Sequence, residues 1–123
     1  MIVDESDPRF YVAPSMIPGA GQGLFARVPL PAGERLAVTG MRVIRGSASD
    51  LCTAFADEYK FRVGDDLLIP CGLAAMANHS SQPNLHKVVV AEALFLELTR
   101  AVMAGEELCF AYSEYARERY RIR

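Results

Sequence analysis

The chain has 123 residues, 51% of them hydrophobic, and this length and composition fit one globular domain rather than a disordered segment. Its 13 basic and 15 acidic residues leave a net charge of −2, which argues against direct nucleic-acid binding, because such binding needs a basic surface. The apolar runs fall well short of the roughly 20 residues that a membrane-spanning helix needs, so we expect no membrane association.

Cysteine usage indicates reduced thiols rather than a disulfide framework or a metal site. Cys52, Cys71 and Cys109 are far apart, and none has the close Cys or His spacing of a zinc site. An odd count without a secretory leader is typical of a reducing compartment. We therefore expect no metal and an intracellular location, cytoplasmic for a prokaryotic source, with the nucleus open for a eukaryotic or viral one.

Short strands separated by Gly- and Pro-rich turns make up most of the predicted elements. Residues 1–9 are predicted to be a loose terminus. In chain order, the predicted strands are residues 10–12, 24–26, 35–44, 61–63, 67–69, 88–90, 94–98 and 108–112.

Helices are predicted at three places. Ser49 is expected to cap a helix over residues 50–58, with an apolar face formed by Leu51, Ala54, Phe55 and Tyr59. The small apolar residues 72–77 suit a short buried helix, and residues 113–123 a terminal one. Many short strands with few helices, and no βαβ alternation, predict a mostly β domain.

A glycine cluster, Gly19-Ala20-Gly21-Gln22-Gly23, follows the first predicted strand. Glycines at this spacing allow sharp turns and a close approach of the backbone to a ligand. The cluster lacks the third glycine of the dinucleotide-binding pattern, because Leu24 stands at that position. It also lacks the Lys and Ser/Thr of a phosphate-binding loop. On its own it is better explained as a plain turn.

The most polar stretch is Asn78-His79-Ser80-Ser81-Gln82-Pro83-Asn84, which follows the small apolar residues. Polar groups gathered at the edge of a core must find hydrogen-bond partners or bind a ligand. A satisfied turn, with His79 as a structural donor, explains the residues alone equally well. A Ser-His-Asp catalytic group lacks a nucleophile elbow, and His79 and His86 lack the carboxylate pair of a metal site.

Three segments, taken together and in order, resemble the SET-domain family of protein-lysine methyltransferases. They are Gly21-Gln22-Gly23-Leu24-Phe25, the polar stretch from Asn78 to Asn84, and Glu107-Leu108-Cys109-Phe110-Ala111-Tyr112. In the family the second segment typically reads Asn-His-Ser-Cys-x-Pro-Asn, so Ser81 is a small departure. The resemblance runs from about Tyr11 to Tyr115 and is greatest to members that add one methyl group to lysine.

This resemblance implies a fold, a cofactor and roles for individual residues. Residues 1–123 would form a single SET domain, in which the C-terminal segment threads under a loop as a pseudoknot. The cofactor would be S-adenosylmethionine, with the glycine cluster at its amino-acid end and the backbone of His79 at its adenine. Tyr112 would be the catalytic residue beside the sulfonium and the target amine. The cofactor-binding residues implied by the resemblance are Ala20, Gly21, Gln22, Gly23, Asn78, His79 and Tyr112.

The lysine side of the site departs from the family. Val38 and Lys87 stand where many members place tyrosines that line the channel for the substrate lysine, and Tyr115 is a further candidate for its wall. Many members add a cysteine-rich tail after the last motif, whereas here only residues 113–123 follow. We therefore expect this segment or a second subunit to close the channel, and a homodimer is the favoured arrangement.

The function implied by the resemblance is methyl transfer from S-adenosylmethionine to a lysine side chain of a protein substrate, as in the histone-lysine methyltransferases. Val38 and Lys87 keep an alternative open, a catalytically impaired SET domain that binds a protein partner.

Overall fold

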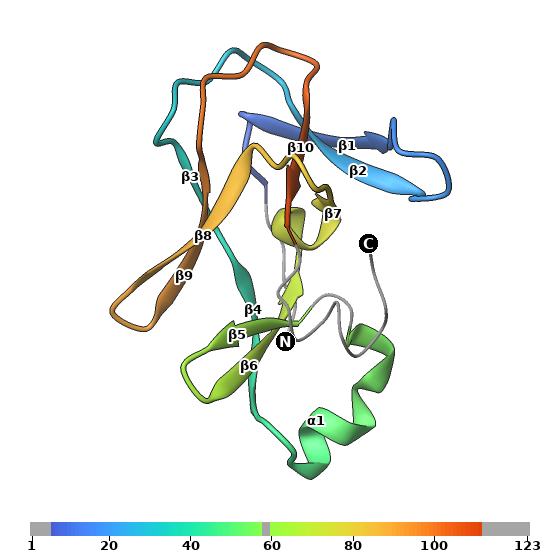
Figure 1. Ribbon diagram of the computed structural model, residues 1–123, viewed down its shortest axis with the longest axis vertical. Coiled ribbons are helices and arrows are strands. Elements are labelled where there is room, and N and C mark those ends of the chain that lie inside the picture. The colour runs from blue at the N-terminus through green and yellow to red at the C-terminus, as the bar shows by residue number, and fades with distance from the viewer. Residues whose placement is uncertain (1–5, 58–59, 112–123) are drawn as a thin grey trace.

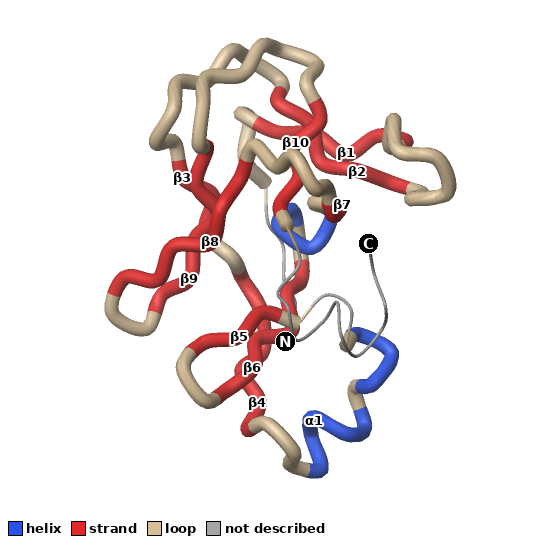
Figure 2. Tube along the Cα trace, in the orientation of Figure 1, coloured by secondary structure: helices blue, strands red, loops and turns tan. Residues whose placement is uncertain are grey.

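The structure is a computed structural model that describes residues 6–57 and 60–111. This part of the chain consists of short strands with brief helical segments (Figures 1 and 2). The strands are β1 (Phe10–Pro14), β2 (Gln22–Ala26), β3 (Arg35–Ala37), β4 (Thr39–Ile44), β5 (Phe61–Val63), β6 (Asp66–Cys71), β7 (Asn78–His79), β8 (Leu85–Val90), β9 (Ala93–Leu98) and β10 (Glu107–Phe110). The helical segments are α1 (Ala48–Cys52) and the 3-10 helices η1 (Ala54–Ala56) and η2 (Leu73–Met76). The predicted mostly β fold is confirmed.

The strands form two sheets. The larger sheet has the order β1-β2-β10-β8-β9-β3, with β7 also paired to β10, and the smaller has the order β4-β6-β5. Strand β10 is antiparallel to β2 but parallel to β7 and β8. Although β10 comes late in the sequence, it lies in the middle of the larger sheet (Figure 1). It therefore connects the β1–β2 hairpin to the β8–β9 hairpin.

Residues 35–44, predicted as one strand, form two strands in different sheets. Strand β3 pairs with β9 and β4 pairs with β6. The change falls at Val38, whose N–H donates to the carbonyl of Leu94 at 2.9 Å. Just beyond it, a side chain at Gly40 would collide with the carbonyl oxygen of Ile69. The one-strand prediction was wrong because alternation of apolar residues does not reveal which strand is the partner.

A cluster of buried apolar side chains joins the two sheets. It includes Leu24, Leu96 and Leu108 from the larger sheet and Phe61 from the smaller. The ring of Phe61 stacks on that of Phe110, with 5.1 Å between the ring centroids. Aromatic pairs at this separation add specific contacts to the burial of apolar area. The stack packs β5 against the end of β10.

The predicted helix over residues 50–58 is replaced by α1 and η1. The cap is Ser47 rather than Ser49, because the Ser47 hydroxyl accepts from the N–H of Asp50. The expected apolar face does not point into the core, since Leu51 and Phe55 are 63% and 83% exposed. The prediction was wrong because buried charges, rather than an apolar stripe, decide which side of this segment faces inward.

These buried charges are Lys60, Asp50 and Asp57. The Lys60 ammonium donates to Asp50 Oδ1 at 2.7 Å, to Asp57 Oδ1 at 2.5 Å and to the Asp50 carbonyl at 2.9 Å. Burial lowers the pKa of Lys60, but the hydrogen bonds to both carboxylates outweigh it, so the pKa is raised overall. A buried charge without partners is strongly unfavourable, so the cluster fixes α1 and η1 beside β5.

The predicted loose terminus is corrected at its described end. The Arg9 guanidinium pairs with Asp7 at 2.7 Å and with Glu34 at 2.8 Å. It also donates to the carbonyl of Arg35 at 3.1 Å. These contacts attach the chain before β1 to the start of β3, a long-range pairing that local composition does not reveal.

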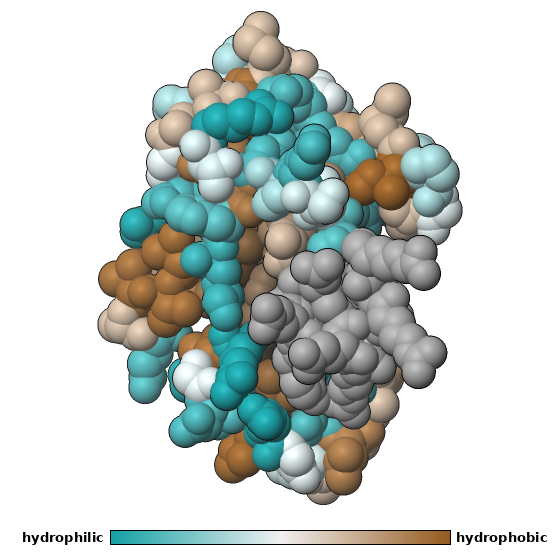
Figure 3. All heavy atoms as spheres, in the orientation of Figure 1, coloured by the Kyte–Doolittle hydropathy of each residue, from teal (hydrophilic) through white to brown (hydrophobic). Residues whose placement is uncertain are grey.

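The surface in Figure 3 is mixed, with hydrophilic residues over most of the visible face. Apolar atoms gather at the tip of the β8–β9 hairpin, where Val89 and Val90 are exposed. Within residues 6–57 and 60–111, no helix is long and apolar enough to cross a membrane.

Candidate functional site

Strand β10 brings the three sequence motifs together. Leu108 lies opposite Leu24 of the glycine-cluster strand, and Cys109 lies opposite Asn78 of the polar stretch. Because β10 pairs with β2 along its first half and with β7 along its second, segments more than fifty residues apart meet at one place. The order of motifs in the sequence therefore corresponds to one site in space.

Asn84, at the end of the polar stretch, fixes β10 in position. Its buried amide donates to the Glu107 carbonyl at 2.9 Å and accepts from the Cys109 N–H at 2.8 Å. The N–H of Ser80 donates to the Phe110 carbonyl at 3.1 Å. A buried side-chain amide bonded at both ends is a specific anchor, because losing either partner leaves a polar atom unsatisfied. The sequence gave no signal for this role beyond the polarity of the stretch.

The glycine cluster forms the turn between β1 and β2. The N–H of Ser15 donates to the carbonyl of Gly21 at 2.8 Å, and the N–H of Ala20 donates to that of Ile17 at 3.1 Å. Gly21 has a φ of +75°, which side chains disfavour. The turn predicted from the residues is present, and it borders a pocket.

This pocket has a volume of about 310 Å³, within the usual range for small-molecule sites. Ala20, Gln22 and Asn78, three of the residues that the sequence assigned to the cofactor, are among its lining residues. Gly21, Gly23 and His79 are their chain neighbours but are not in the lining. The full lining consists of Ala20, Gln22, Ala56, Pro70, Ala75, Met76 and Asn78.

The side chain of Asn78 joins two walls of this pocket, which we call the cofactor pocket after the residues that the resemblance assigned to it. Its Nδ2 donates to the Gln22 carbonyl at 2.8 Å and to Glu107 Oε2 at 3.3 Å. His79 follows on β7, half-buried and opposite Phe110. The wall between the glycine turn and the polar strand is therefore held by polar contacts.

Glu107 belongs to the third motif, but sequence reasoning gave it no role. Its carboxylate accepts from the Ser15 hydroxyl at 2.7 Å, from the Met16 N–H at 2.8 Å and from Asn78. It also packs against Gly23, where an added Cβ would lie 2.5 Å from Oε2. The available signal in the sequence was the acidic residue at the start of an otherwise apolar strand.

Cys109, opposite Asn78 in register, carries a buried thiol. Burial, followed by the negative charge of Glu107, raises the pKa of its thiol to about 11. A thiol with this pKa stays protonated at neutral pH, and the thiolate is the reactive form.

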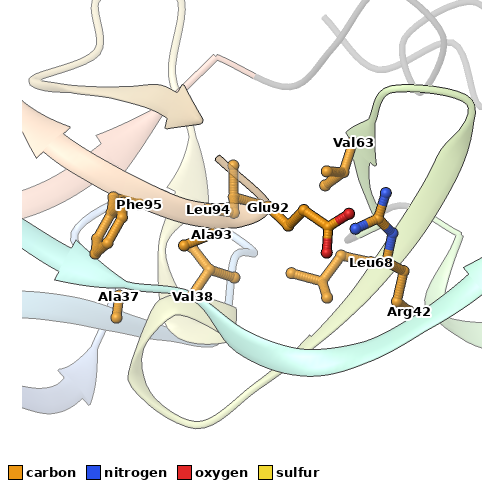
Figure 4. Close-up of a pocket in the computed structure, with 9 residues that line it drawn as sticks. All are labelled: Ala37, Val38, Arg42, Val63, Leu68, Glu92, Ala93, Leu94 and Phe95. Atoms are coloured by element: carbon orange, nitrogen blue, oxygen red, sulfur yellow. The ribbon is translucent and has the colours of Figure 1, made fainter. Parts of the chain in front are cut away.

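Val38 lies in a second, smaller pocket of about 140 Å³, whose lining shares no residue with the cofactor pocket. Figure 4 shows apolar side chains around it, with the carboxylate of Glu92 and the guanidinium of Arg42 pointing toward each other. The pocket lies between the β8–β9 hairpin and the smaller sheet. Its lining consists of Ala37, Val38, Arg42, Val63, Leu68, Glu92, Ala93, Leu94 and Phe95.

Lys87 connects the same two parts of the molecule. Its Nζ leaves β8 and donates to the carbonyl of Arg62 on β5 at 2.7 Å. Burial, with a smaller effect from the positive charge of Arg62, lowers the pKa of Lys87. Val38 and Lys87, both assigned to the substrate channel, thus lie at the junction of the two sheets. Tyr112 and Tyr115, the other residues assigned to catalysis and to the channel, lie outside the described residues.

Two of the solved structures that share this fold come from a parasite and a fungal complex. A Plasmodium falciparum protein proposed to be a histone methyltransferase matches with a TM-score of 0.65 and 15% identity, over 89% of this chain and 96% of that one. A humanized mutant of the Chaetomium thermophilum Polycomb Repressive Complex 2, bound to an inhibitor, matches with a TM-score of 0.75 and 19% identity. That match covers 89% of this chain and 15% of the other chain.

No curated protein matches the sequence of this chain. The family model of the SET domain, by contrast, matches residues 21–113, which is most of the chain and includes all three motifs. The chain belongs to the SET-domain family.

Proposed function

We propose that the protein is an S-adenosylmethionine-dependent protein-lysine N-methyltransferase. The observation that carries this proposal is the pocket of about 310 Å³, which Ala20 and Gln22 of the first motif line together with Asn78 of the second. A shared fold does not by itself imply a shared activity, because function depends on the residues of the site. A pocket that residues of two separate motifs line together is therefore stronger support than the fold alone.

The residues of the pocket fit this cofactor. Apolar side chains such as Ala75 and Met76 offer contacts for a nucleoside, while Asn78 offers a polar group at one wall. Both N–H groups of that amide already have protein acceptors, and within residues 6–57 and 60–111 no donor occupies its Oδ1. An amide oxygen of a pocket-lining residue that can still accept a hydrogen bond suits an ammonium group, which only donates hydrogen bonds. When bound, S-adenosylmethionine supplies an electrophilic methyl group on a sulfonium.

The protein's contribution to the reaction is positioning and the removal of a proton from the target amine. A lysine has an ordinary pKa of about 10.4 and must be neutral to attack. Burial lowers the pKa of an amine, as it does for Lys87 in this chain, and a partly desolvated channel would lower that of the target lysine in the same way. Tyr112 is proposed to orient the amine through its hydroxyl, and holding the reacting groups in line is the main source of acceleration.

A radioactive transfer assay tests the proposal. The protein is incubated with methyl-labelled S-adenosylmethionine and a panel of lysine-rich proteins that includes histones. We expect label in lysine for the wild type, and its loss in Tyr112→Phe and Asn78→Ala, with His86→Ala as the matched control that retains it. Absence of labelled lysine with every substrate would contradict the proposal.

A second candidate function is a binding module without transferase activity. Val38 and Lys87 favour it, because an aliphatic side chain and an amine bonded to a backbone carbonyl occupy the positions assigned to the lysine channel. This candidate predicts thermal stabilisation by S-adenosylmethionine with no transfer to any protein. Two measurements therefore distinguish the two functions. Both predict cofactor binding, but only the methyltransferase predicts label in lysine.

A further inference from the structure

The carboxylate of Glu107 lies where three segments of the chain meet. Oε2 accepts from the Ser15 hydroxyl at 2.7 Å and from Asn78 Nδ2 at 3.3 Å, and Oε1 accepts from the Met16 N–H at 2.8 Å. Ser15 and Met16 lead into the glycine turn, Asn78 is on β7, and Glu107 itself is on β10. A carboxylate only accepts hydrogen bonds, so it satisfies all three donors at once.

These bonds determine which way the Asn78 amide faces. Its two N–H groups have the Gln22 carbonyl and the Glu107 carboxylate as acceptors. Turning the amide over would place Oδ1 against two other oxygens, which is electrostatically unfavourable. Glu107 and the Gln22 carbonyl therefore hold the nitrogen of Asn78, which leaves the oxygen of this pocket-lining amide as the atom that can accept from a ligand.

Gly23 makes room for this arrangement. A Cβ at this position would lie 2.5 Å from Glu107 Oε2 and 3.3 Å from the Cβ of Ser15. The absence of a side chain thus admits the carboxylate between β1, β2 and β7. This glycine, predicted to approach the cofactor, packs instead against an acidic side chain.

We propose that Glu107 is a positioning residue of the cofactor site. It orients the Asn78 amide so that Oδ1 accepts from the ammonium group at the amino-acid end of the ligand. The proposal rests on the proposed function, because it assumes an S-adenosyl ligand in this pocket. Glu107 does not line the pocket, but through Asn78 it would affect the binding of the amino-acid end of that ligand.

Glu107→Gln tests the proposal, because glutamine has nearly the same shape but replaces one acceptor oxygen with a donor. Calorimetric titration measures affinity for S-adenosylhomocysteine, which carries the ammonium group, and for methylthioadenosine, which lacks the amino-acid end. We expect the variant to bind S-adenosylhomocysteine about tenfold or more weakly, since hydrogen bonds to charged groups are the strong ones. Affinity for methylthioadenosine should stay within about twofold, because its contacts do not involve the Asn78 amide.

The neighbouring Glu106→Gln variant is the matched control. Glu106 accepts from the Met103 N–H at the turn before β10 and does not contact Asn78. Unchanged affinity of Glu107→Gln for S-adenosylhomocysteine would overturn the proposal, and so would an equal loss for both ligands, which would indicate a merely structural role. If the wild type binds neither ligand, the proposed function itself fails, and this outcome is distinct from the other two.

Discussion

The cofactor pocket and the junction around Val38 differ in how they are held together. At the pocket, the Asn78 amide bonds to the Gln22 carbonyl and to the Glu107 carboxylate. The Asn84 amide bonds to the backbone of β10 at Glu107 and Cys109. The junction between the sheets has a mainly apolar lining, together with the hydrogen bonds from Val38 N–H to the Leu94 carbonyl and from Lys87 to the Arg62 carbonyl. A network of bonded polar side chains specifies one geometry, whereas apolar contacts tolerate substitution.

This difference shows where the chain keeps the family pattern. The motif residues that meet on β10 bond to one another, so changing one disturbs several. Val38 and Lys87 are not part of this side-chain network. Replacing the tyrosines expected at these positions should therefore change the stability of the fold little. We infer that the cofactor side is the constrained part of the molecule and that the lysine side is free to vary.

The largest effect is expected from Lys60→Met, which removes the cation that holds the segment carrying the pocket residue Ala56. Two buried carboxylates would lose the Lys60 cation, and breaking such a cluster costs about 3–5 kcal/mol. Chemical denaturation measures the loss, with Arg42→Met, which breaks an exposed ion pair, as the control. A loss below about 1 kcal/mol would show that the cluster is not an anchor.

The same cluster predicts a dependence on alkaline pH. Because the pKa of Lys60 is raised in the folded protein, its contribution is fully present below the ordinary pKa of about 10.4. It is lost as the pH rises through the folded pKa. Thermal unfolding between neutral and strongly alkaline pH should show this loss in the wild type. A similar loss in Lys60→Met would assign it to other groups.

The next effect is expected from Gly23→Ala, which crowds the Glu107 carboxylate. Overpacking of this kind typically costs about 1–3 kcal/mol, and the displaced carboxylate should also weaken binding of S-adenosylhomocysteine. Gly105→Ala is the control, because Gly105 has open space around it and a positive φ, whereas Gly23 is crowded and has no positive φ. That control should lose stability through backbone strain and keep its affinity. Unchanged affinity in Gly23→Ala would separate the glycine from the cofactor site.

A smaller effect on stability is expected from Lys87→Met, which removes one hydrogen bond to a backbone carbonyl. The change should be about 0.5–1.5 kcal/mol, and the affinity for S-adenosylhomocysteine should not change. Methyl transfer is where this variant should differ, since Lys87 is assigned to the channel. If Lys87→Met impairs cofactor binding, the separation between the two sides is wrong.

The smallest effect is expected from His86→Ala on the outer face of the larger sheet. His86 bonds to exposed Glu97, which Arg35 also pairs with, and Arg35 is the larger cause of the lowered pKa of Glu97. Exposed ion pairs are screened by salt and add little, so the unfolding temperature should match the wild type at moderate ionic strength. A clear loss of stability would show that this surface pair matters.

The sequence predicted most of the strands because they follow local signals. Alternating residues and flanking turns located the β8–β9 hairpin and β10, and the short apolar run before Asn78 predicted η2. The helix near Ser47 was placed wrongly, because its inward side carries Asp50 bonded to the distant Lys60. The break at Val38 was missed for a similar reason, since partner strands lie far away in the sequence.

The candidate site was predicted only in part. The motifs identified Ala20, Gln22 and Asn78 through their resemblance to a family, and these residues line one pocket. The roles of Glu107 and Asn84 could not be deduced, because they depend on β10 lying between strands from three other regions. Residue types indicate which groups can bond, whereas topology decides which of them meet.

The most direct measurement is the affinity of the wild type, Asn78→Ala and Val38→Tyr for S-adenosylmethionine by calorimetric titration. We predict saturable binding by the wild type, a loss of about tenfold or more in Asn78→Ala, and affinity within about twofold of wild type in Val38→Tyr. No binding by the wild type, or a loss in Val38→Tyr with none in Asn78→Ala, would contradict the assignment of the two pockets.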